Sequence, residues 1–205
     1  MSNIEKQIEK NINLLQEIEV IAKKITIGSN KRDLLFTGFF RNTLSHYYSI
    51  VILCEKQLYN SAFSMIRVFF ESAIRAEYLY KVFPEEKIDK LYDGIGWNNA
   101  FPTVKKICEE IDAEFDTDFY TEIKETAYKA MNDYTHTGYQ QISRNFDEEK
   151  GTIGANFSEE MIVDSLKGTS VVAYILAIGY FEKIGLVNGS ITDQDIQNFE
   201  TNSPQ

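Results

Sequence analysis

Three charged side chains, placed at intervals of four inside an apolar segment, most constrain how this chain can fold. Residues 60 to 80 contain neither glycine nor proline, and the segment is long enough for about six helical turns. Apolar side chains surround it, as is typical of a helix inside a bundle. Arg67, Glu71 and Arg75 would nevertheless share one face of that helix. Because a buried charge is costly unless it is paired, we expect a polar partner from elsewhere in the chain.

The flanking sequence predicts further helices and gives no clear strand pattern. Isoleucine and leucine recur at intervals of three and four from about residue 3 to 27, which indicates an amphipathic helix. Caps and breakers delimit further helices over about 31–59, 84–92, 101–113, 117–134 and 158–184. We expect Asn60 or Ser61 to cap the central helix. Residues 139–156 are polar and are expected to form a loop or a short irregular helix.

These elements predict an all-α fold, a bundle of four main helices with an inserted segment of short helices. A chain of 205 residues is the size of one domain. The expected helical-bundle domain covers residues 1–187. Residues 188–205 are expected to form a polar C-terminal tail, in which residues 191–199 could make a short docked helix.

Charge and cysteine content narrow the classes of function. The formal net charge is -10, which disfavours non-specific binding to phosphate backbones but allows a local basic cleft. Cys54 and Cys108 lack metal-binding spacing and are expected to be reduced. The N-terminus lacks the order of a signal peptide, and the longest apolar run, residues 171–181, is too short to span a bilayer. We therefore expect a cytoplasmic protein that does not enter a membrane.

Imidazole chemistry in this chain would have to use His46 or His136, because the sequence contains two histidines. His136 lies in a polar run from residue 131 to 144, at the end of a predicted helix. One interpretation is a capping turn in which Gly138 takes a positive φ. The other is a polar cluster that meets Arg67, Glu71 and Arg75 in the bundle interior. The sequence leaves both open.

Two patterns together carry a resemblance to known proteins. Arg67 and Glu71, with Arg75 one turn later, precede the run Asn132-Asp133-Tyr134-Thr135-His136-Thr137-Gly138, which Gln141 and Arg144 follow. This pair of patterns resembles an uncharacterised family of bacterial helical proteins, which is similar to the HEPN superfamily, over most of residues 45–185. The resemblance implies a helical bundle, frequently dimeric, that belongs to toxin–antitoxin or antiphage systems. Active HEPN proteins cleave RNA without a metal, through an arginine and a histidine four to six residues apart.

A literal match to that catalytic motif exists at Arg41, Asn42 and His46. The match lies upstream of the central helix, whereas the resemblance places the motif at a later helix junction. It also lies beside aromatic residues on a helix that must pack. The alternative is a solvated Arg41 and a half-buried His46 without a catalytic role. If His136 is catalytic instead, its arginine partner has to be Arg67, Arg75 or Arg144.

Metal-independent RNA cleavage needs a base, an acid and a cation on the phosphate. We expect His136 to act as base or acid, Arg67 and Arg75 to contact phosphate, and Glu71 to orient them. The expected lining of the site is Tyr134, Tyr139, Gln141 and Arg144. Symmetric dimerisation could bring two copies of the cluster together and form the cleft that an acidic protein needs.

Other chemistries find little support in the sequence. It contains no glycine-rich phosphate loop, no G-x-S-x-G and no H-E-x-x-H, and neither histidine follows a glutamate by three residues. We therefore expect no metal and no cofactor. The alternative function is a non-catalytic sensor that binds a nucleotide or another small anion in the Arg67, Glu71 and His136 pocket. A third hypothesis is a purely structural network in a protein that acts through partners, such as a cognate protein from the same operon.

Overall fold

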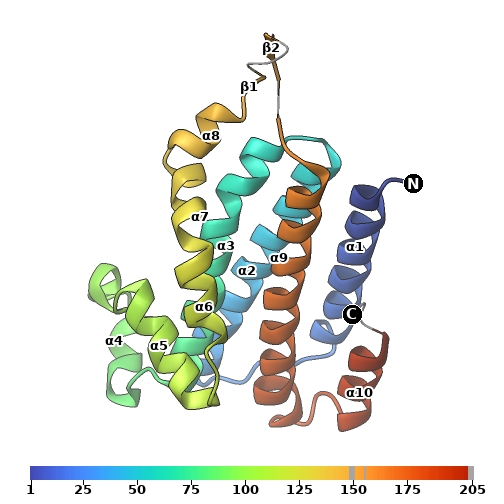
Figure 1. The fold of residues 1–205 in the computed structure, drawn as a ribbon. Helices are drawn as coiled ribbons and strands as arrows, with labels where there is room; N and C mark the ends of the chain where they lie inside the picture. Colours follow the sequence, from blue (N-terminus) through green and yellow to red (C-terminus); the bar gives the residue numbers. More distant parts are fainter. Residues whose placement is uncertain (148–150, 155, 203–205) are drawn as a thin grey trace.

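The computed structural model describes residues 1–147, 151–154 and 156–202, and this part of the chain is all-α apart from one very short strand pair. The longest helices lie side by side (Figure 1). They are α1 (Asn3–Ala22), α2 (Lys31–Glu55), α3 (Tyr59–Lys81) and α9 (Glu159–Tyr180). α3 is the predicted charged helix. Its N-cap is Leu58, which makes no side-chain cap bond, so the predicted cap at Asn60 or Ser61 is wrong.

Short helices connect α3 to α9. In chain order they are η1 (Glu85–Lys87), α4 (Ile88–Tyr92), η2 (Trp97–Asn99), α5 (Val104–Phe115), α6 (Phe119–Thr126), α7 (Tyr128–Thr135) and α8 (Tyr139–Ser143). The prediction of one helix over 117–134 is wrong, because the chain breaks at Ala127 between α6 and α7. The hydroxyl of Thr126 donates to the carbonyl of Glu122, a local bond that competes with the helical ladder.

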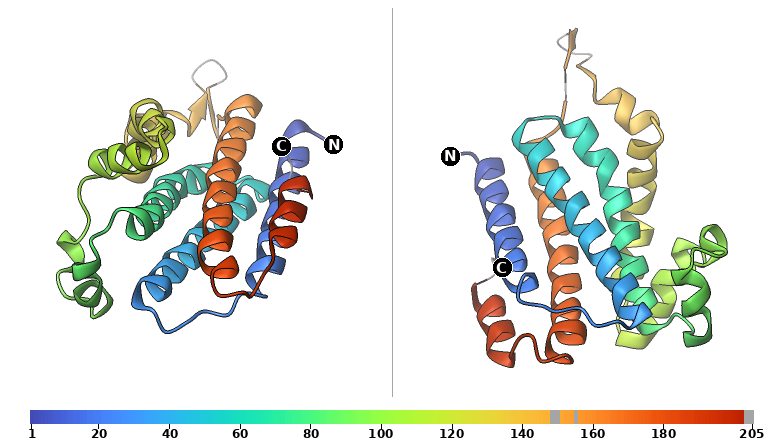
Figure 2. Two further views of the ribbon diagram at one scale, coloured as in Figure 1. Left: turned by 90° about the horizontal axis from the view of Figure 1, so that it is seen from below. Right: turned by 180° about the vertical axis from the view of Figure 1, so that it is seen from behind.

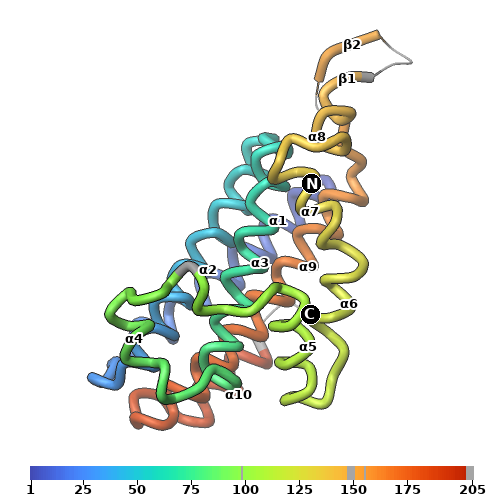
Figure 3. Tube along the Cα trace, turned by 90° about the vertical axis from the view of Figure 1, so that its left-hand side faces the viewer, coloured from blue at the N-terminus to red at the C-terminus, as the bar shows by residue number. Residues whose placement is uncertain are grey.

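A small arm follows α8 where the sequence predicted a loop or an irregular helix. Strand β1 (Phe146–Asp147) pairs antiparallel with β2 (Thr152–Ile153), and Phe146 lies opposite Ile153. Residues 148–150 and 155 of the predicted segment lie outside the described residues. The arm projects beyond one end of the bundle, and α4 and α5 lie at the other end (Figures 1 and 3).

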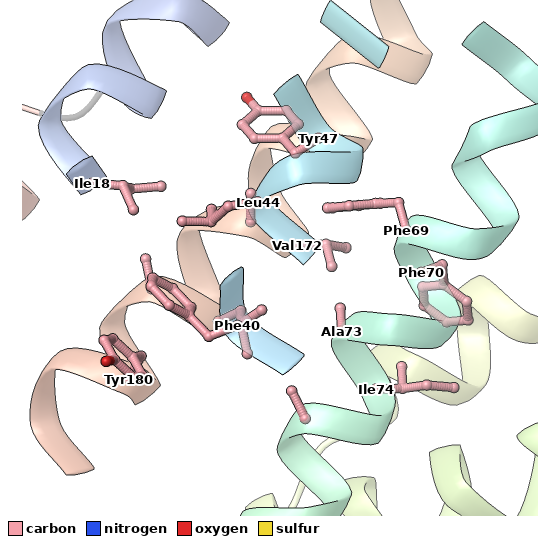
Figure 4. Packing of buried hydrophobic residues seen from close by; sticks show 14 of the residues in the cluster. Ile18, Phe40, Leu44, Tyr47, Phe69, Phe70, Ala73, Ile74, Val172 and Tyr180 are labelled. Carbon is pink, nitrogen blue, oxygen red and sulfur yellow. The ribbon is translucent and has the colours of Figure 1, made fainter. Parts of the chain in front are cut away.

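The core forms where α2, α3 and α9 meet. Phe40 of α2 stacks on Tyr180 of α9 with ring centroids 3.9 Å apart. Phe69 and Ala73 of α3 are buried on the side of α3 that faces these helices (Figure 4). Burial of aromatic side chains of this size is the main source of stability in a bundle. This core holds one side of α3 in place and leaves another side for polar contacts.

The helix from Glu159 to Leu186, which joins α9 to the π-helical turn η3 (Phe181–Leu186), contains an 18-residue stretch with a mean hydropathy of 1.5. Among the described residues it is the one helix long and apolar enough to cross a membrane, a test that core helices of soluble proteins also pass. Here Leu166, Ala173 and Leu176 are buried, and α9 packs against α1, α2 and α3.

The segment after residue 188 docks on the bundle instead of forming a free polar tail. Helix α10 (Asp193–Asn202) follows and lies beside α1 (Figure 2). Ile191 and Phe199 belong to the buried core. Gly185 makes this docking feasible, because an added Cβ would lie 2.6 Å from the side chain of Ile191. The docked-helix alternative for residues 191–199 is therefore the one observed. Residues 203–205 lie outside the described residues.

Candidate functional site: a polar seam between α3 and α7

The predicted charged face of α3 lies against α7. The contacts between the two helices run in opposite order along the chain. Ser64, near the start of α3, donates to the carbonyl of Tyr134 near the end of α7, at 2.8 Å. Glu71, one helical stretch further along α3, meets Tyr128 at the beginning of α7. The two helices are therefore antiparallel neighbours (Figure 1). We call the polar contacts among Arg67, Glu71, Arg75, Tyr128 and His136 the α3–α7 polar seam.

Glu71 lies at the centre of this seam. Its Oε1 accepts hydrogen bonds from Nε of Arg67 at 2.7 Å and from the hydroxyl of Tyr128 at 2.6 Å. Its Oε2 accepts one from Nη2 of Arg75 at 3.2 Å. The guanidinium group of Arg67 also lies over the ring of Tyr128, 5.5 Å from its centroid. Glu71 thus holds both arginines and ties them to α7.

These contacts decide the charge state of Glu71. Burial alone would raise the pKa of Glu71, but the hydrogen bonds from Tyr128 and Arg67 and the charge of Arg75 outweigh it, and the net pKa is lowered. Burial would conversely lower the pKa of Arg67, and its contact with Glu71 raises it instead. The carboxylate of Glu71 and the guanidinium group of Arg67 are therefore both ionised at neutral pH.

His136 completes the seam through a short contact between its Nε2 and Nη1 of Arg67. A guanidinium group can only donate, so Nε2 must accept, and this assigns the ring proton of neutral His136 to Nδ1. His136 is exposed to solvent. This contact confirms the expectation from the sequence that His136 lies against the charged face of α3.

The seam lies at the edge of the bundle, so the expectation of a cluster in the bundle interior is wrong. The side chain of Glu71 is 15% exposed, that of Arg67 23% and that of Arg75 40%. The physical reason is that α7 covers only one flank of this face of α3. Charges in such a position need pairing, but they remain open to water and to a soluble ligand.

The turn after α7 differs in detail from the prediction. Gly138 has a φ of -74°, and the positive φ belongs to Thr137, at 57°. Gly138 is needed for a different reason: an added Cβ would lie 2.8 Å from the side chain of Asp133. The N–H of Gly138 donates to the carbonyl of Asp133 at 2.6 Å. This tight turn fixes where His136 leaves α7.

The four predicted lining residues separate into different places. Tyr134 is buried in the core beside Phe63, with ring centroids 5.1 Å apart, and burial raises its pKa. Gln141 reaches α3, where its amide donates to the hydroxyl of Ser64 at 3.0 Å. Arg144 donates to the carbonyl of Asn156 at 3.2 Å, and Tyr139 is 82% exposed. Of these four, Gln141 reaches α3 through its side chain, and Tyr134 reaches it through its backbone carbonyl, which accepts from the hydroxyl of Ser64.

A family model for a family of unknown function matches residues 40–182. The chain belongs to this family, DUF6988. The matched DUF6988 region begins in α2, ends in η3 and includes every residue of the polar seam. No curated protein and no solved structure matches the chain.

The alternative motif at Arg41, Asn42 and His46 lies on α2. Its arginine and its histidine contact different neighbours. Arg41 pairs with Glu19 of α1 at 2.8 Å. Nε2 of His46 lies 3.2 Å from the amide of Asn42, which also donates to the hydroxyl of Ser72 on α3. Burial lowers the pKa of His46. Among the described residues of the DUF6988 match, the structure gives no hydrogen bond between the side chains of Arg41 and His46.

Sequence reasoning missed Tyr128 and Asn132 on the matched segment. Tyr128 binds Glu71, and Oδ1 of Asn132 is buried without a hydrogen-bond partner among the described residues. A signal was present: residues 128, 132 and 136 are spaced by four, as are Arg67, Glu71 and Arg75. Two such series on antiparallel helices can face each other along their whole length.

Metal chemistry has no obvious centre in the part of the chain that the structure describes. No group of three or more His, Cys, Asp or Glu side chains gathers there to hold an ion. Cys54 and Cys108 are both buried, and burial raises the pKa of each thiol to about 12. The polar seam is therefore the cluster that offers acid–base and anion-binding groups together.

Proposed function

We propose that this DUF6988 protein is a HEPN-like ribonuclease of a bacterial defence or toxin system, which cleaves RNA without a metal. The observation that carries the proposal is the contact between Arg67 and His136 at a solvent-facing edge. This contact unites a cation for the phosphate with an imidazole for proton transfer. Two guanidinium groups against one carboxylate also leave a local positive charge on an acidic protein.

The proposed reaction follows from the tautomer of His136. Nε2 carries the lone pair, so it would take the proton of the ribose 2'-hydroxyl once Arg67 turns from the ring to the phosphate. The 2'-oxygen then attacks phosphorus, and the 5'-oxygen leaves with a proton from a second acid. Glu71, which accepts from Nε of Arg67 at 2.7 Å, keeps this guanidinium group close to the reacting atoms. In a symmetric dimer, His136 of a second copy would be that second acid.

RNA cleavage in EDTA by the purified protein tests this proposal. His136→Ala is expected to lower the rate at least ~100-fold, because general acid–base catalysis supplies that much or more. His46→Ala is the matched control, since it removes the other histidine, and its rate should match that of the wild type. Loss of cleavage in His46→Ala alone would move the site to the motif at Arg41, Asn42 and His46. Equal rates in all three proteins would rule out both.

The alternative function is a non-catalytic sensor for a nucleotide or another small anion. One observation favours it: Glu71 already neutralises part of the charge of Arg67 and Arg75, which suits reversible binding. A ligand at 100 times its Kd would stabilise the protein by about 2.7 kcal/mol. A rise in melting temperature with a nucleotide, without any RNA cleavage, would select this function. If Arg67→Ala and Glu71→Ala only unfold the protein, the seam is structural.

We also propose the assignments that go with this function. The bundle of α1, α2, α3 and α9 is HEPN-like, the protein forms a homodimer, and a cognate protein from the same operon controls it. We place the protein in the cytoplasm, and we infer that α9 is a helix of the bundle because α1, α2 and α3 pack against it. Light scattering of the purified protein tests the dimer, and fractionation of cells tests the location.

A further inference from the structure

A cavity lies on the opposite side of the α3–α7 pair from the polar seam. Its volume is about 460 Å³, which is within the range of small-molecule sites. Phe70 of α3, Met131 of α7 and Val172 of α9 line three of its walls. The apolar lining is open to water on one side. Covering it with an apolar occupant removes that surface from water, which favours binding.

We propose that this cavity binds a small, neutral, largely apolar molecule, and that its occupancy moves α7 and so alters the contact between His136 and Arg67. The proposal goes beyond the proposed function, because it holds whether or not the seam cleaves RNA. Ligand binding is its first part. The coupling to His136 is its second part.

The lining decides the chemistry of the occupant. Asp164 is the charged residue at the cavity, and Lys167 pairs with it at 3.5 Å, so the rim carries little net charge. The remaining lining is mainly aromatic, aliphatic or methionine side chain, and methionine adapts to irregular apolar shapes. A neutral apolar molecule fits this lining, whereas an anion would lose its hydration without gaining a positive partner.

The coupling follows from residues that are neighbours in sequence. Ile66 and Phe70 line the cavity, and Arg67 and Glu71 next to them carry the seam. On α7, Met131 lines the cavity, while His136 lies about one turn further and contacts Arg67. The cavity is lined by α3, α7 and α9, so a molecule inside it presses on α3 and α7, the two helices whose spacing sets the seam.

The test uses the neutral fluorescent probe N-phenyl-1-naphthylamine with the full chain. Saturable fluorescence enhancement is expected in the wild type. Gly168→Leu places a side chain at the cavity, where an added Cβ meets nothing within 4 Å, and should weaken binding about tenfold or more. Gly38→Leu is the matched control, because Gly38 is also a helical glycine with free space but does not line the cavity. It should bind the probe like the wild type. Ala130→Leu, which fills the cavity from α7, replaces Gly168→Leu if that variant does not fold.

The chain has two histidines, so imidazole NMR signals report the coupling directly. Probe binding should shift the signals of His136 and leave those of His46, which lies on α2, unchanged. Equal probe binding by wild type, Gly168→Leu and Gly38→Leu would overturn the site. A change of oligomeric state in Gly168→Leu without weaker probe binding would instead make the cavity an interface between copies. Binding without a shift at His136 would overturn the coupling.

Discussion

Two glutamates of α3, six residues apart, are held in opposite ways. Glu71, in the polar seam, accepts hydrogen bonds from Arg67, Arg75 and Tyr128, and its pKa is lowered. Glu77 is 4% exposed, and its Oε1 has no hydrogen-bond partner among the described residues. One helix therefore accommodates one acid by pairing and another by favouring its protonated form.

The surroundings of Glu77 explain the difference. Burial raises its pKa to about 7; Lys81 and Lys183 lower it in part, and Glu182 raises it. It lies against α9, where an added Cβ on Gly179 would be 3.2 Å from Oε1. Burial raises the pKa of Tyr120 on α6, and the nearby Glu77 raises it further. A charge at Glu77 would leave Oε1 without a hydrogen-bond donor, whereas both oxygens of Glu71 accept hydrogen bonds.

The largest expected effect is on how the free energy of unfolding depends on pH, which should differ between Glu77 and Glu71. Because the folded pKa of Glu77 is raised from 4.5 to about 7, its contribution to stability is present below pH 4.5 and is lost as the pH rises through 7. The shift corresponds to about 3 kcal/mol. Glu77→Gln removes this loss, so the variant should be more stable than the wild type above pH 7. Urea unfolding of both proteins across this pH range measures the difference.

The second prediction concerns Glu71, whose pKa shift has the opposite sign. Glu71→Gln should lower the free energy of unfolding at pH 7 by about 2 kcal/mol, because Arg67 and Arg75 lose their counter-charge at a half-buried site. The loss should shrink in acid, since a lowered folded pKa gives stability that disappears as the pH falls through it. If the change in the free energy of unfolding depended on pH in the same way for Glu71→Gln and Glu77→Gln, the two acids would not be held in opposite ways.

Tyr128→Phe tests the link from Glu71 to α7. It deletes the hydroxyl that lies 2.6 Å from Oε1 and keeps the ring under Arg67. We expect a loss of about 1.5 kcal/mol, as for a hydrogen bond to a charged group. Tyr174→Phe, on α9, is a matched control outside the seam. Losses of equal size in chemical denaturation would show that the seam bond contributes nothing specific.

The smallest effect is expected at Gly179. Gly179→Ala gains helix propensity but places a Cβ 3.2 Å from Glu77, so the net change should stay within about 1 kcal/mol. In a Glu77→Ala background the clash is gone, and the same substitution should stabilise the protein. A double-mutant cycle measures the coupling between the two positions. A coupling of zero would show that Glu77 does not press on Gly179.

The sequence predicted Glu71 and overlooked Glu77, and the reason is physical. Spacing by four reveals charges that share a helix face, so Arg67, Glu71 and Arg75 were found together. Glu77 also has an opposite charge four residues later, Lys81, but this spacing does not show that Glu77 is buried, because α9, which buries it, begins about 80 residues later. Contacts between distant elements depend on packing that a single sequence does not display.

The helices were more predictable than their junctions. Apolar periodicity gave α1, α2, α3 and α9 to within a few residues at most ends. The break at Ala127, the strand pair at Phe146 and the positive φ at Thr137 were missed. Each depends on local hydrogen bonds, such as the one from Thr126 to Glu122, that compete with helix propensity by small margins.

The break at Ala127 makes α7 a helix of eight residues. A helix this short does not persist alone in water, because nucleation costs more than so few backbone bonds return. Its helicity therefore depends on neighbours, among them Arg67 and Glu71 across the seam. The rate of amide hydrogen exchange in α7 therefore reports whether the seam contacts are intact. A change that weakens those contacts should raise the exchange rate in α7 before it raises the rate in α3.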